Sequence, residues 1–211
     1  MQAKERTLYP GIGSYLLNQA LLPLKLAVPQ PIIQKIPFLT TNQEIRLGLV
    51  LSQVKGNLLD IGCAENKLVA MYREKGGQGL GVDVHPWPGA DQVVADTSKL
   101  AFADGNFETI TLVACLNHIP NREDVLKEAA RLLSDQGRLI LTNLTPFISR
   151  LWHAFAFWDA DQDDRGMKPG EVWGLTDSEL SSMLAHAGLK IELKKPFSWG
   201  LNQLYICKKS F

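Results

Sequence analysis

The sequence predicts an α/β fold in which a mostly parallel sheet carries helices on both faces. Apolar runs of strand length alternate with amphipathic helical segments along most of the 211 residues. One of these runs, residues 58–61, ends in a glycine turn that leads into a helix. Asp60 lies near the end of this strand, and Asp83 closes the next strand 23 positions later (83 − 60). Because ligands of open α/β sheets bind at such strand ends, we expect a binding site there.

The composition fits one globular domain with appendages, since 45% of the residues are hydrophobic and 21% are charged. Lys plus Arg and Asp plus Glu number 22 each, so no overall charge favours nucleic acid or acidic membrane surfaces. Cys63, Cys115 and Cys207 show no Cys-x-x-Cys spacing. This pattern indicates reduced thiols in a cytoplasmic protein, with neither a disulfide framework nor a zinc site.

Residues 1–40 precede the expected sheet and form an N-terminal appendage whose stretch from residue 15 to residue 28 is very apolar. Pro23 breaks or bends any helix in that stretch. The stretch is too short and too polar for a membrane span, and no signal-peptide cleavage site follows it. Two interpretations remain open. The first is a helix packed on the sheet or over the ligand. The second is an apolar lid or surface helix within residues 10–40 that contacts a membrane peripherally and admits a lipid-like substrate.

The elements of the sheet follow in order. Thr41 and Glu44 form a capping box that starts a helix ending near Gly56. Gly62 permits the sharp turn after the first strand, and residues 65–75 carry the apolar stripe of a helix. We expect further strands at residues 79–84, 92–95, 107–113, 138–143, 189–193 and 202–208. Between them we expect helices at residues 122–133 and after a second capping box at Thr176 and Glu179.

Residues 145–175 exceed what a minimal domain of this kind needs. An aromatic-rich run is followed by alternating acidic residues from Asp159 to Asp164. The alternation is similar to a calcium-binding loop, but Asp164 stands where that loop needs glycine. We therefore expect an acidic turn or substrate contacts in this insertion, and no metal site.

The turn after the first strand, Leu-Asp-Ile-Gly-Cys-Ala-Glu-Asn-Lys, resembles the first motif of class I S-adenosylmethionine-dependent methyltransferases. The resemblance covers residues 50–145 and follows the order of the type 11 group, through Gly81-Val82-Asp83-Val84, Ala95-Asp96-Thr97, His118, and residues 125–133 and 137–142. Ala64 and Asn66 stand where this family usually has glycine. A turn with one glycine also disfavours a nicotinamide or flavin dinucleotide site.

The resemblance implies a Rossmann-like three-layer sandwich with a mostly parallel seven-stranded sheet, an antiparallel C-terminal edge hairpin, and a methyltransferase domain over residues 41–211. It also implies S-adenosylmethionine as cofactor, with Asp83 near the ribose hydroxyls and Asp96 near the adenine amino group. Trp87 either lies against the adenine or caps the core. The implied cofactor residues are Asp60, Gly62, Cys63, Ala64, Asp83, Val84, Asp96, Thr97 and Val113.

Methyl transfer from a sulfonium releases a neutral leaving group, so positioning and water exclusion can supply most of the acceleration. A hydroxyl acceptor also benefits from a general base, for which His118 is the candidate, with a purely local structural role as the alternative. The residues expected to contact a small-molecule or lipid-like substrate are Trp152, His153, Trp158 and Trp173. The alternative function is a non-catalytic module that holds a protein partner, and it rests on the missing glycines at residues 64 and 66.

Overall fold

The computed structural model describes residues 39–146 and 169–210 without interruption, together with residues 17, 18, 20–22, 25, 28, 30–33, 35 and 36. Its strands are β1 (Leu58–Ile61), β2 (Gly79–Asp83), β3 (Gln92–Val93), β4 (Phe107–Val113), β5 (Leu133–Leu144), β6 (Leu189–Phe197) and β7 (Asn202–Lys209). Its helices are α3 (Gln30–Ile33), α4 (Asn42–Leu51), α5 (Lys67–Glu74), α6 (Arg122–Leu132) and α8 (Asp177–His186), with a 3-10 turn η1 (Leu116–His118).

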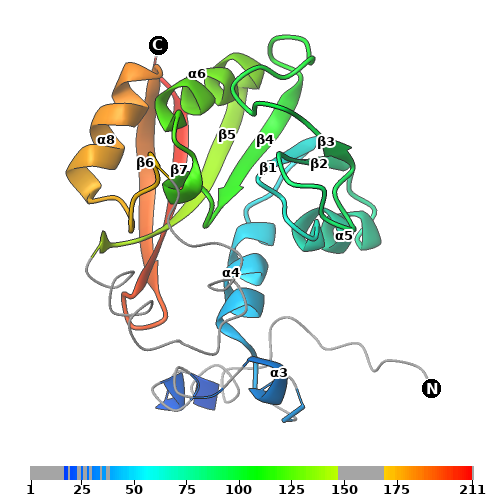
Figure 1. The fold of residues 1–211 in the computed structure, drawn as a ribbon, viewed down its shortest axis with the longest axis vertical. Coiled ribbons are helices and arrows are strands. Elements are labelled where there is room, and N and C mark those ends of the chain that lie inside the picture. The colour runs from blue at the N-terminus through cyan, green and yellow to red at the C-terminus, as the bar shows by residue number, and fades with distance from the viewer. Residues whose placement is uncertain are drawn as a thin grey trace.

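These strands form one seven-stranded sheet in the order β3-β2-β1-β4-β5-β7-β6 (Figure 1). Strands β1 to β5 run parallel to one another, whereas β7 runs antiparallel to both β5 and β6. The chain thus moves outward from β1 through β2 to β3, then returns to place β4 on the other side of β1. The predicted sheet and its antiparallel edge hairpin are confirmed.

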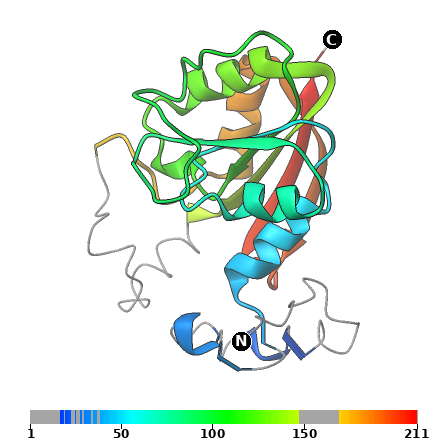
Figure 2. The same ribbon diagram turned by 90° about the vertical axis from the view of Figure 1, so that its right-hand side faces the viewer.

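Two apolar cores lie on opposite faces of the sheet, because successive strand residues point to opposite sides. Leu59 joins the core beneath α6 and α8, whereas Leu58 joins the core beneath α4 and α5. On β7, Tyr205 and Ile206 divide between the two cores in the same way. Figure 2 shows the resulting sandwich, with α6 and α8 on one side of the sheet and α4 and α5 on the other. The predicted three-layer architecture is therefore confirmed.

Both capping boxes form as the sequence predicts. The amide of Glu44 donates to Thr41 Oγ1 at 3.1 Å, and the Thr41 amide donates to the Glu44 carboxylate at 2.6 Å. Thr176 and Glu179 repeat this reciprocal arrangement at the start of α8. Each box satisfies two backbone N–H groups that the first helical turn leaves without partners.

The fifth strand begins earlier than residues 138–143 predict. Leu133, expected in the preceding helix, pairs with Phe107 at the start of β4, and an irregularity in register separates this pair from Thr109 and Arg138. The strand therefore includes Gly137, although a glycine inside a strand weakens it and is a local signal for its end. The helix α4 also ends at Leu51, before the predicted limit near Gly56.

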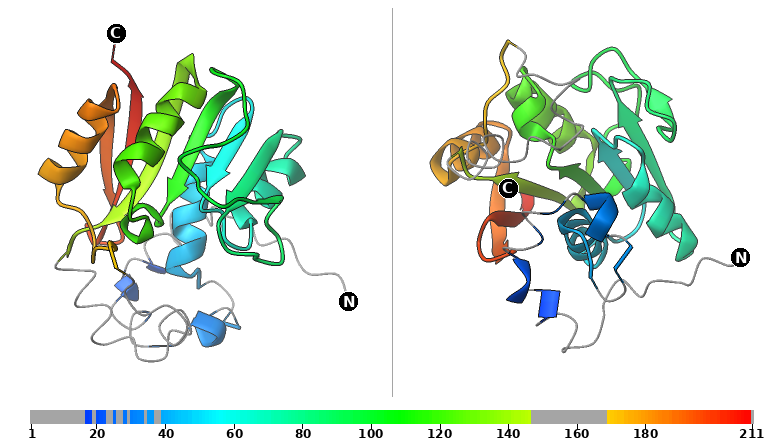
Figure 3. Two further views of the ribbon diagram at one scale, coloured as in Figure 1. Left: turned by 45° about the horizontal axis from the view of Figure 1, so that its top comes forward. Right: turned by 60° about the horizontal axis from the view of Figure 1, so that its bottom comes forward.

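The described N-terminal residues join the sheet domain at the start of α4. The side-chain oxygen of Asn18 accepts hydrogen bonds from Lys25 Nζ at 3.1 Å and from the Thr40 amide at 2.8 Å. Leu22 and Ile33 are buried, yet neither belongs to the two sheet cores. Figure 3 shows α3 on the side where the parallel strands end. Among the described residues, no helix is both long and apolar enough to cross a membrane.

Candidate functional site

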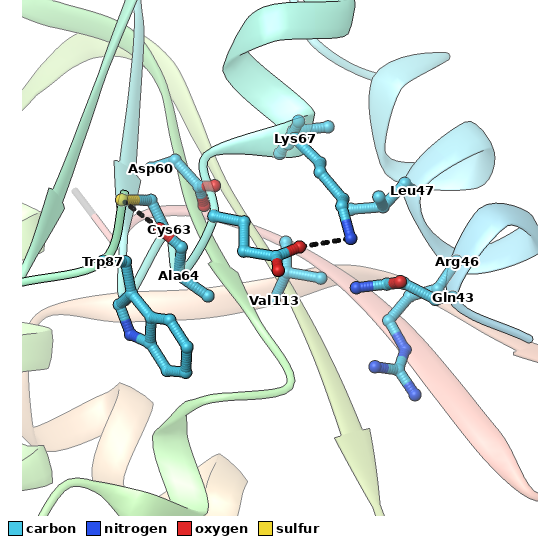
Figure 4. A pocket seen from close by; sticks show the side chains of 12 residues that line it. Gln43, Arg46, Leu47, Asp60, Cys63, Ala64, Lys67, Trp87 and Val113 are labelled. Atoms are coloured by element: carbon cyan, nitrogen blue, oxygen red, sulfur yellow. Dashed lines mark hydrogen bonds and ion pairs between the residues drawn. The ribbon is translucent and has the colours of Figure 1, made fainter. Parts of the chain in front are cut away.

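A cavity of about 250 Å³ opens at the carboxyl ends of β1 and β4. The chain leaves these two neighbouring strands in opposite directions, and such a reversal point is where open α/β sheets bind ligands. The lining residues come from α4, the turn after β1, α5, the loop after β2 and the end of β4 (Figure 4): Gln43, Arg46, Leu47, Asp60, Gly62, Cys63, Ala64, Glu65, Lys67, Leu68, Trp87 and Val113.

Gly62 gives the turn after β1 its shape. Its φ of +73° lies in the left-handed region, and a Cβ atom there would approach the Cβ and Sγ of Cys115 to 2.9 Å. The amides of Gly62 and Cys63 both donate to the carbonyl of Val82, at 2.9 and 3.2 Å. The turn thus folds back over the end of β2, which leaves the β1 carboxyl end open to the cavity.

Asp60 places a carboxyl group in the wall of the cavity although only 3% of the residue is exposed. Thr111 Oγ1 donates to its Oδ1 at 2.6 Å. Burial raises the pKa of Asp60 to about 7. The hydrogen bond from Thr111 lowers this pKa and so offsets part of the effect of burial, whereas the nearby charge of Asp83 raises it further. At neutral pH a cation in the cavity would therefore favour ionisation of this group.

Asp83 organises the same turn from the end of β2. Its Oδ2 accepts from the Ala64 amide and its Oδ1 from the His85 amide, both at 2.9 Å. Ala64 has a φ of 47° and Asn66 a φ of 59°, so both residues hold the left-handed backbone that glycine adopts most easily. The two departures from the glycine pattern thus leave a left-handed turn in place.

Asp91 stabilises this turn, and sequence reasoning did not single it out. Its carboxylate accepts from the Gly81 amide and from Asn66 Nδ2, both at 2.8 Å, and forms an ion pair with Arg73. Burial opposes ionisation, but the hydrogen bonds from Arg73, Gly81 and Asn66 together hold the pKa of Asp91 below its ordinary value. The sequence carries no signal for this role, because the partners meet only in the folded chain.

Helix α4 supplies the wall of the cavity that lies across from Trp87 (Figure 4). This wall consists of Gln43, Arg46 and Leu47, whose i, i+3, i+4 spacing places them on one face of the helix. Arg46 Nη2 donates to Asn202 Oδ1 at 3.4 Å, while its Nε is buried without a hydrogen-bond partner among the described residues. Burial lowers the pKa of Arg46 to about 10. Sequence reasoning missed Arg46. The feature of the sequence that could have indicated it is a single positive charge within an otherwise apolar stretch of the helix.

The remaining predicted cofactor residues divide into two groups. Cys63 and Val113 line the cavity, and burial, followed by the nearby Asp60 and Asp83, raises the pKa of the Cys63 thiol to about 12. The second group is not among the residues that line the cavity and comprises Asp83, Val84, Asp96 and Thr97. Of these, Val84 is 57% exposed, and Asp96 accepts hydrogen bonds from Ser98 and Asn121.

Neither the predicted catalytic residue His118 nor the predicted substrate residue Trp173 is among the residues that line the cavity. His118 ends η1, and its Nδ1 lies 3.4 Å from Glu171 Oε2. Trp173 is half-buried in the segment that leads into α8. Trp152, His153, Trp158 and the acidic run at residues 159–164 lie outside the described residues. Within residues 39–146, 169–210 and the described N-terminal positions, no cluster of three or more His, Cys, Asp or Glu is arranged to hold a metal ion.

A family model described as a methyltransferase domain matches residues 35–194. A ubiquinone biosynthesis O-methyltransferase from Idiomarina loihiensis is 23% identical over 181 residues, which cover 72% of this chain and 74% of that protein. A ubiquinone/menaquinone biosynthesis C-methyltransferase from Ectopseudomonas mendocina is 29% identical over 69 residues, 31% of this chain and 27% of its own length. The solved structure of a SAM-dependent methyltransferase from Methanosarcina mazei matches with a TM-score of 0.56 and 18% identity, covering 77% of this chain and 97% of that one.

Proposed function

The chain belongs to the class I S-adenosylmethionine-dependent methyltransferases, and from this premise we propose that the cavity beside β1 and β4 holds the cofactor while a small apolar acceptor binds next to it. The cofactor carries an adenine at one end and a carboxylate and an ammonium at the other. Trp87 and Arg46 lie on opposite sides of the cavity (Figure 4), with Val113 between them, and Asp60 also lines the cavity. The residues present therefore fit both ends of the cofactor.

The observation that carries the proposal is the Arg46 guanidinium in the cavity wall, whose buried Nε has no hydrogen-bond partner in the part of the chain that the structure describes. A buried cation without an acidic partner is costly, and an anion supplied by a ligand offsets that cost. We assign Arg46 to the cofactor carboxylate and Asp60 to its cationic groups. Trp87 offers an aromatic surface to the adenine. Asp83 acts through the turn that it organises, and its remaining lone pairs are available to the ribose hydroxyls.

When bound, the cofactor supplies an electrophilic methyl group and a neutral leaving group. The protein consequently needs to align an acceptor with that methyl group and to exclude water. Val113, Leu47 and Leu68 give the cavity apolar wall segments that suit this task. The non-catalytic alternative rested on Ala64 and Asn66, yet both residues keep the left-handed turn that the cofactor motif requires.

For the acceptor we propose a small apolar or lipid-like compound. Two of the relatives carry names that place them in ubiquinone or menaquinone synthesis. Exposed apolar side chains on the described N-terminal residues and at the β6–β7 turn fit an acceptor of this kind: Leu17, Ile32, Ile36 and Trp199. Residues 1–40 and the insertion at residues 145–175 then form the acceptor side of the domain.

Calorimetric titration with S-adenosylhomocysteine, the product form of the cofactor, tests the proposed site. We expect one-to-one binding that is lost in Asp83→Ala, because that variant removes the acceptor for the Ala64 amide and disorganises the turn. Asp124→Ala, at an exposed position in α6, is the matched control and should bind as the native protein does. Absence of binding to the native protein at millimolar ligand would refute the cofactor assignment.

A further inference from the structure

A histidine and a buried glutamate face each other beyond the end of β4. The side chain of Glu171 is 9% exposed, and its Oε2 lies 3.4 Å from Nδ1 of His118, whose side chain is 33% exposed. An ionised carboxylate only accepts hydrogen bonds, so Nδ1 must carry the proton that joins the pair. The Nε2 atom of the neutral imidazole is then left as a proton acceptor.

The backbone around this pair is fixed at several points. The Val172 amide donates to the Asn117 carbonyl at 2.9 Å, so the residues adjoining Glu171 and His118 are bonded to each other. At the far end of the segment, Asn143 Nδ2 donates to the Leu175 carbonyl at 2.7 Å and the Leu175 amide returns a bond to Asn143 at 3.3 Å. The approach of Glu171 to His118 is thus set by main-chain contacts and does not depend on the ion pair alone.

The preceding turn contributes to the same fit. The Arg122 guanidinium donates to the Gly170 carbonyl. Gly170 has a φ of +89°, and a Cβ atom there would come within 2.8 Å of the Pro120 ring. The close approach of residues 170–175 to the end of η1 therefore needs glycine at this position.

The pair lies on the segments that follow the carboxyl ends of β4 and β5. η1 follows β4, whose last residue, Val113, lines the proposed cofactor cavity. Residues 170–175 are pinned to the end of β5 and to η1, and both follow strands whose carboxyl ends border the same edge of the sheet. A buried acid that orients a partly exposed imidazole is the arrangement that general-base catalysis uses.

We propose that Glu171 is a positioning residue that holds His118 as the general base for an acceptor hydroxyl, an inference that rests on the proposed function. The acceptor oxygen forms its bond to the methyl carbon while the carbon–sulfur bond breaks and its electron pair stays on sulfur. The hydroxyl proton passes to Nε2 of His118. The Glu171 carboxylate stabilises the imidazolium through the hydrogen bond from Nδ1. The reaction is then O-methylation of a hydroxyl compound.

The tautomer of His118 tests the positioning role. We would label the histidines with ¹⁵N, record the spectra of the S-adenosylhomocysteine complex at alkaline pH, and identify His118 from its absence in His118→Asn. We expect the native neutral ring to carry its proton on Nδ1 and the Glu171→Ala ring to carry it mainly on Nε2. Glu171→Gln is the matched control, because its side-chain oxygen still accepts from Nδ1. A native proton on Nε2, or the same tautomer in Glu171→Ala, would overturn the proposal.

Turnover tests the chemistry, with catechol as the hydroxyl probe and benzene-1,2-diamine and benzene-1,2-dithiol as matched amine and thiol probes. We expect transfer to oxygen, with kcat lowered about 100-fold in His118→Asn and lowered in Glu171→Gln without a change in KM. Transfer confined to the amine or thiol, or an unchanged kcat in His118→Asn, would contradict the base. Calorimetry on the same variants should show native affinity for S-adenosylhomocysteine. Failure of the native protein to bind it would instead refute the proposed cofactor site.

Discussion

At the scale of single residues, Arg46 combines a position in the cavity wall with a buried, unpaired nitrogen among the described residues. Its Nε is buried and has no hydrogen-bond partner within residues 39–146, 169–210 and the described N-terminal positions, and burial lowers the pKa of Arg46 to about 10. We predict that Arg46→Met weakens binding of S-adenosylhomocysteine roughly 10- to 100-fold, the range expected for loss of a hydrogen bond to a charged group. Binding of 5′-methylthioadenosine, which lacks the carboxylate, should be unchanged. Calorimetric titration of both ligands measures the difference.

An equal loss for the two ligands would show that Arg46 does not read the carboxylate. The free protein gives an independent comparison, because Met removes a cation whose desolvation is not offset by any acid among the described residues. Thermal unfolding without ligand should consequently occur at a higher temperature in Arg46→Met than in the native protein. A lower temperature would mean that the bond from Arg46 to Asn202 contributes more to stability than the desolvation costs.

The environment of Asp60 predicts how both the stability of the protein and its affinity for the cofactor depend on pH. The pKa of Asp60 rises from an ordinary 3.8 to about 7 in the folded protein, chiefly because of burial. Between these values the folded state binds more protons than the unfolded state, so stability falls as pH rises through this window and levels off above it. The cationic cofactor should instead bind more tightly as pH rises, by up to about tenfold per unit below pH 7, because it favours the ionised carboxylate.

Titration with S-adenosylmethionine between pH 5.5 and 8.5, on the order of one unit either side of the expected transition, measures this effect. Asp60→Asn is the matched variant, since its side-chain oxygen can still accept from Thr111. Its affinity should be independent of pH over the same range. An affinity of the native protein that does not change with pH would contradict the proposed contact between Asp60 and the cofactor cations.

At the scale of elements, the turn between β1 and α5 predicts opposite effects for two changes to glycine. Ala64→Gly should raise the free energy of unfolding by about 0.5–1 kcal/mol, because Ala64 holds a φ of 47° without a compensating side-chain bond. Asn66→Gly should lower it, because the side-chain Nδ2 of Asn66 donates to the Gly89 carbonyl and to the Asp91 carboxylate. Urea unfolding with an unchanged m value measures both. Stabilisation by both changes would show that the Asn66 hydrogen bonds are of little consequence.

The elements differ in how well the sequence predicts them, and the difference has a physical cause. β4 matches its predicted residues 107–113 because a central strand is buried on both faces, and residues 109–112 of β4 are all buried and are Thr, Ile or Leu. α4 and α8 begin where their capping boxes predict, since a cap is a local interaction. β5 begins earlier than predicted, because pairing with the start of β4 overrides the local signal of Gly137.

The candidate site was predictable only where a motif lies at the end of a strand. Asp60, Gly62 and Val113 follow that rule and line the cavity. Arg46 and Glu171 do not follow it, because Arg46 reaches the cavity from the helix that precedes β1, and Glu171 contacts His118 from the segment between β5 and α8. Their roles depend on tertiary contacts across long sequence separations, which periodicity and local propensity do not encode.

At the scale of the whole molecule, the described N-terminal residues are tied to the start of α4 and do not contribute to the two sheet cores. Asn18 bonds Lys25 and Thr40, whereas the cores are built from α4 onward. We predict that a chain shortened to residues 39–211 unfolds cooperatively and keeps its affinity for S-adenosylhomocysteine. The cavity residues that we assign to the cofactor all lie within that part of the chain.

The same shortened chain separates the two possible roles of the N-terminal segment. If the segment forms part of the acceptor side, removal should lower turnover of an apolar hydroxyl acceptor through a higher KM and leave cofactor affinity unchanged. A double substitution, Leu17→Ser with Ile36→Ser, provides the matched full-length control, because both side chains are exposed and apolar and their loss leaves the Asn18 contacts in place. It should raise KM in the same direction. Loss of S-adenosylhomocysteine binding in the shortened chain would assign the segment to the cofactor site instead. The hydrogen bond between Asn18 and Thr40 would then hold the start of α4, and with it Arg46, against the cavity.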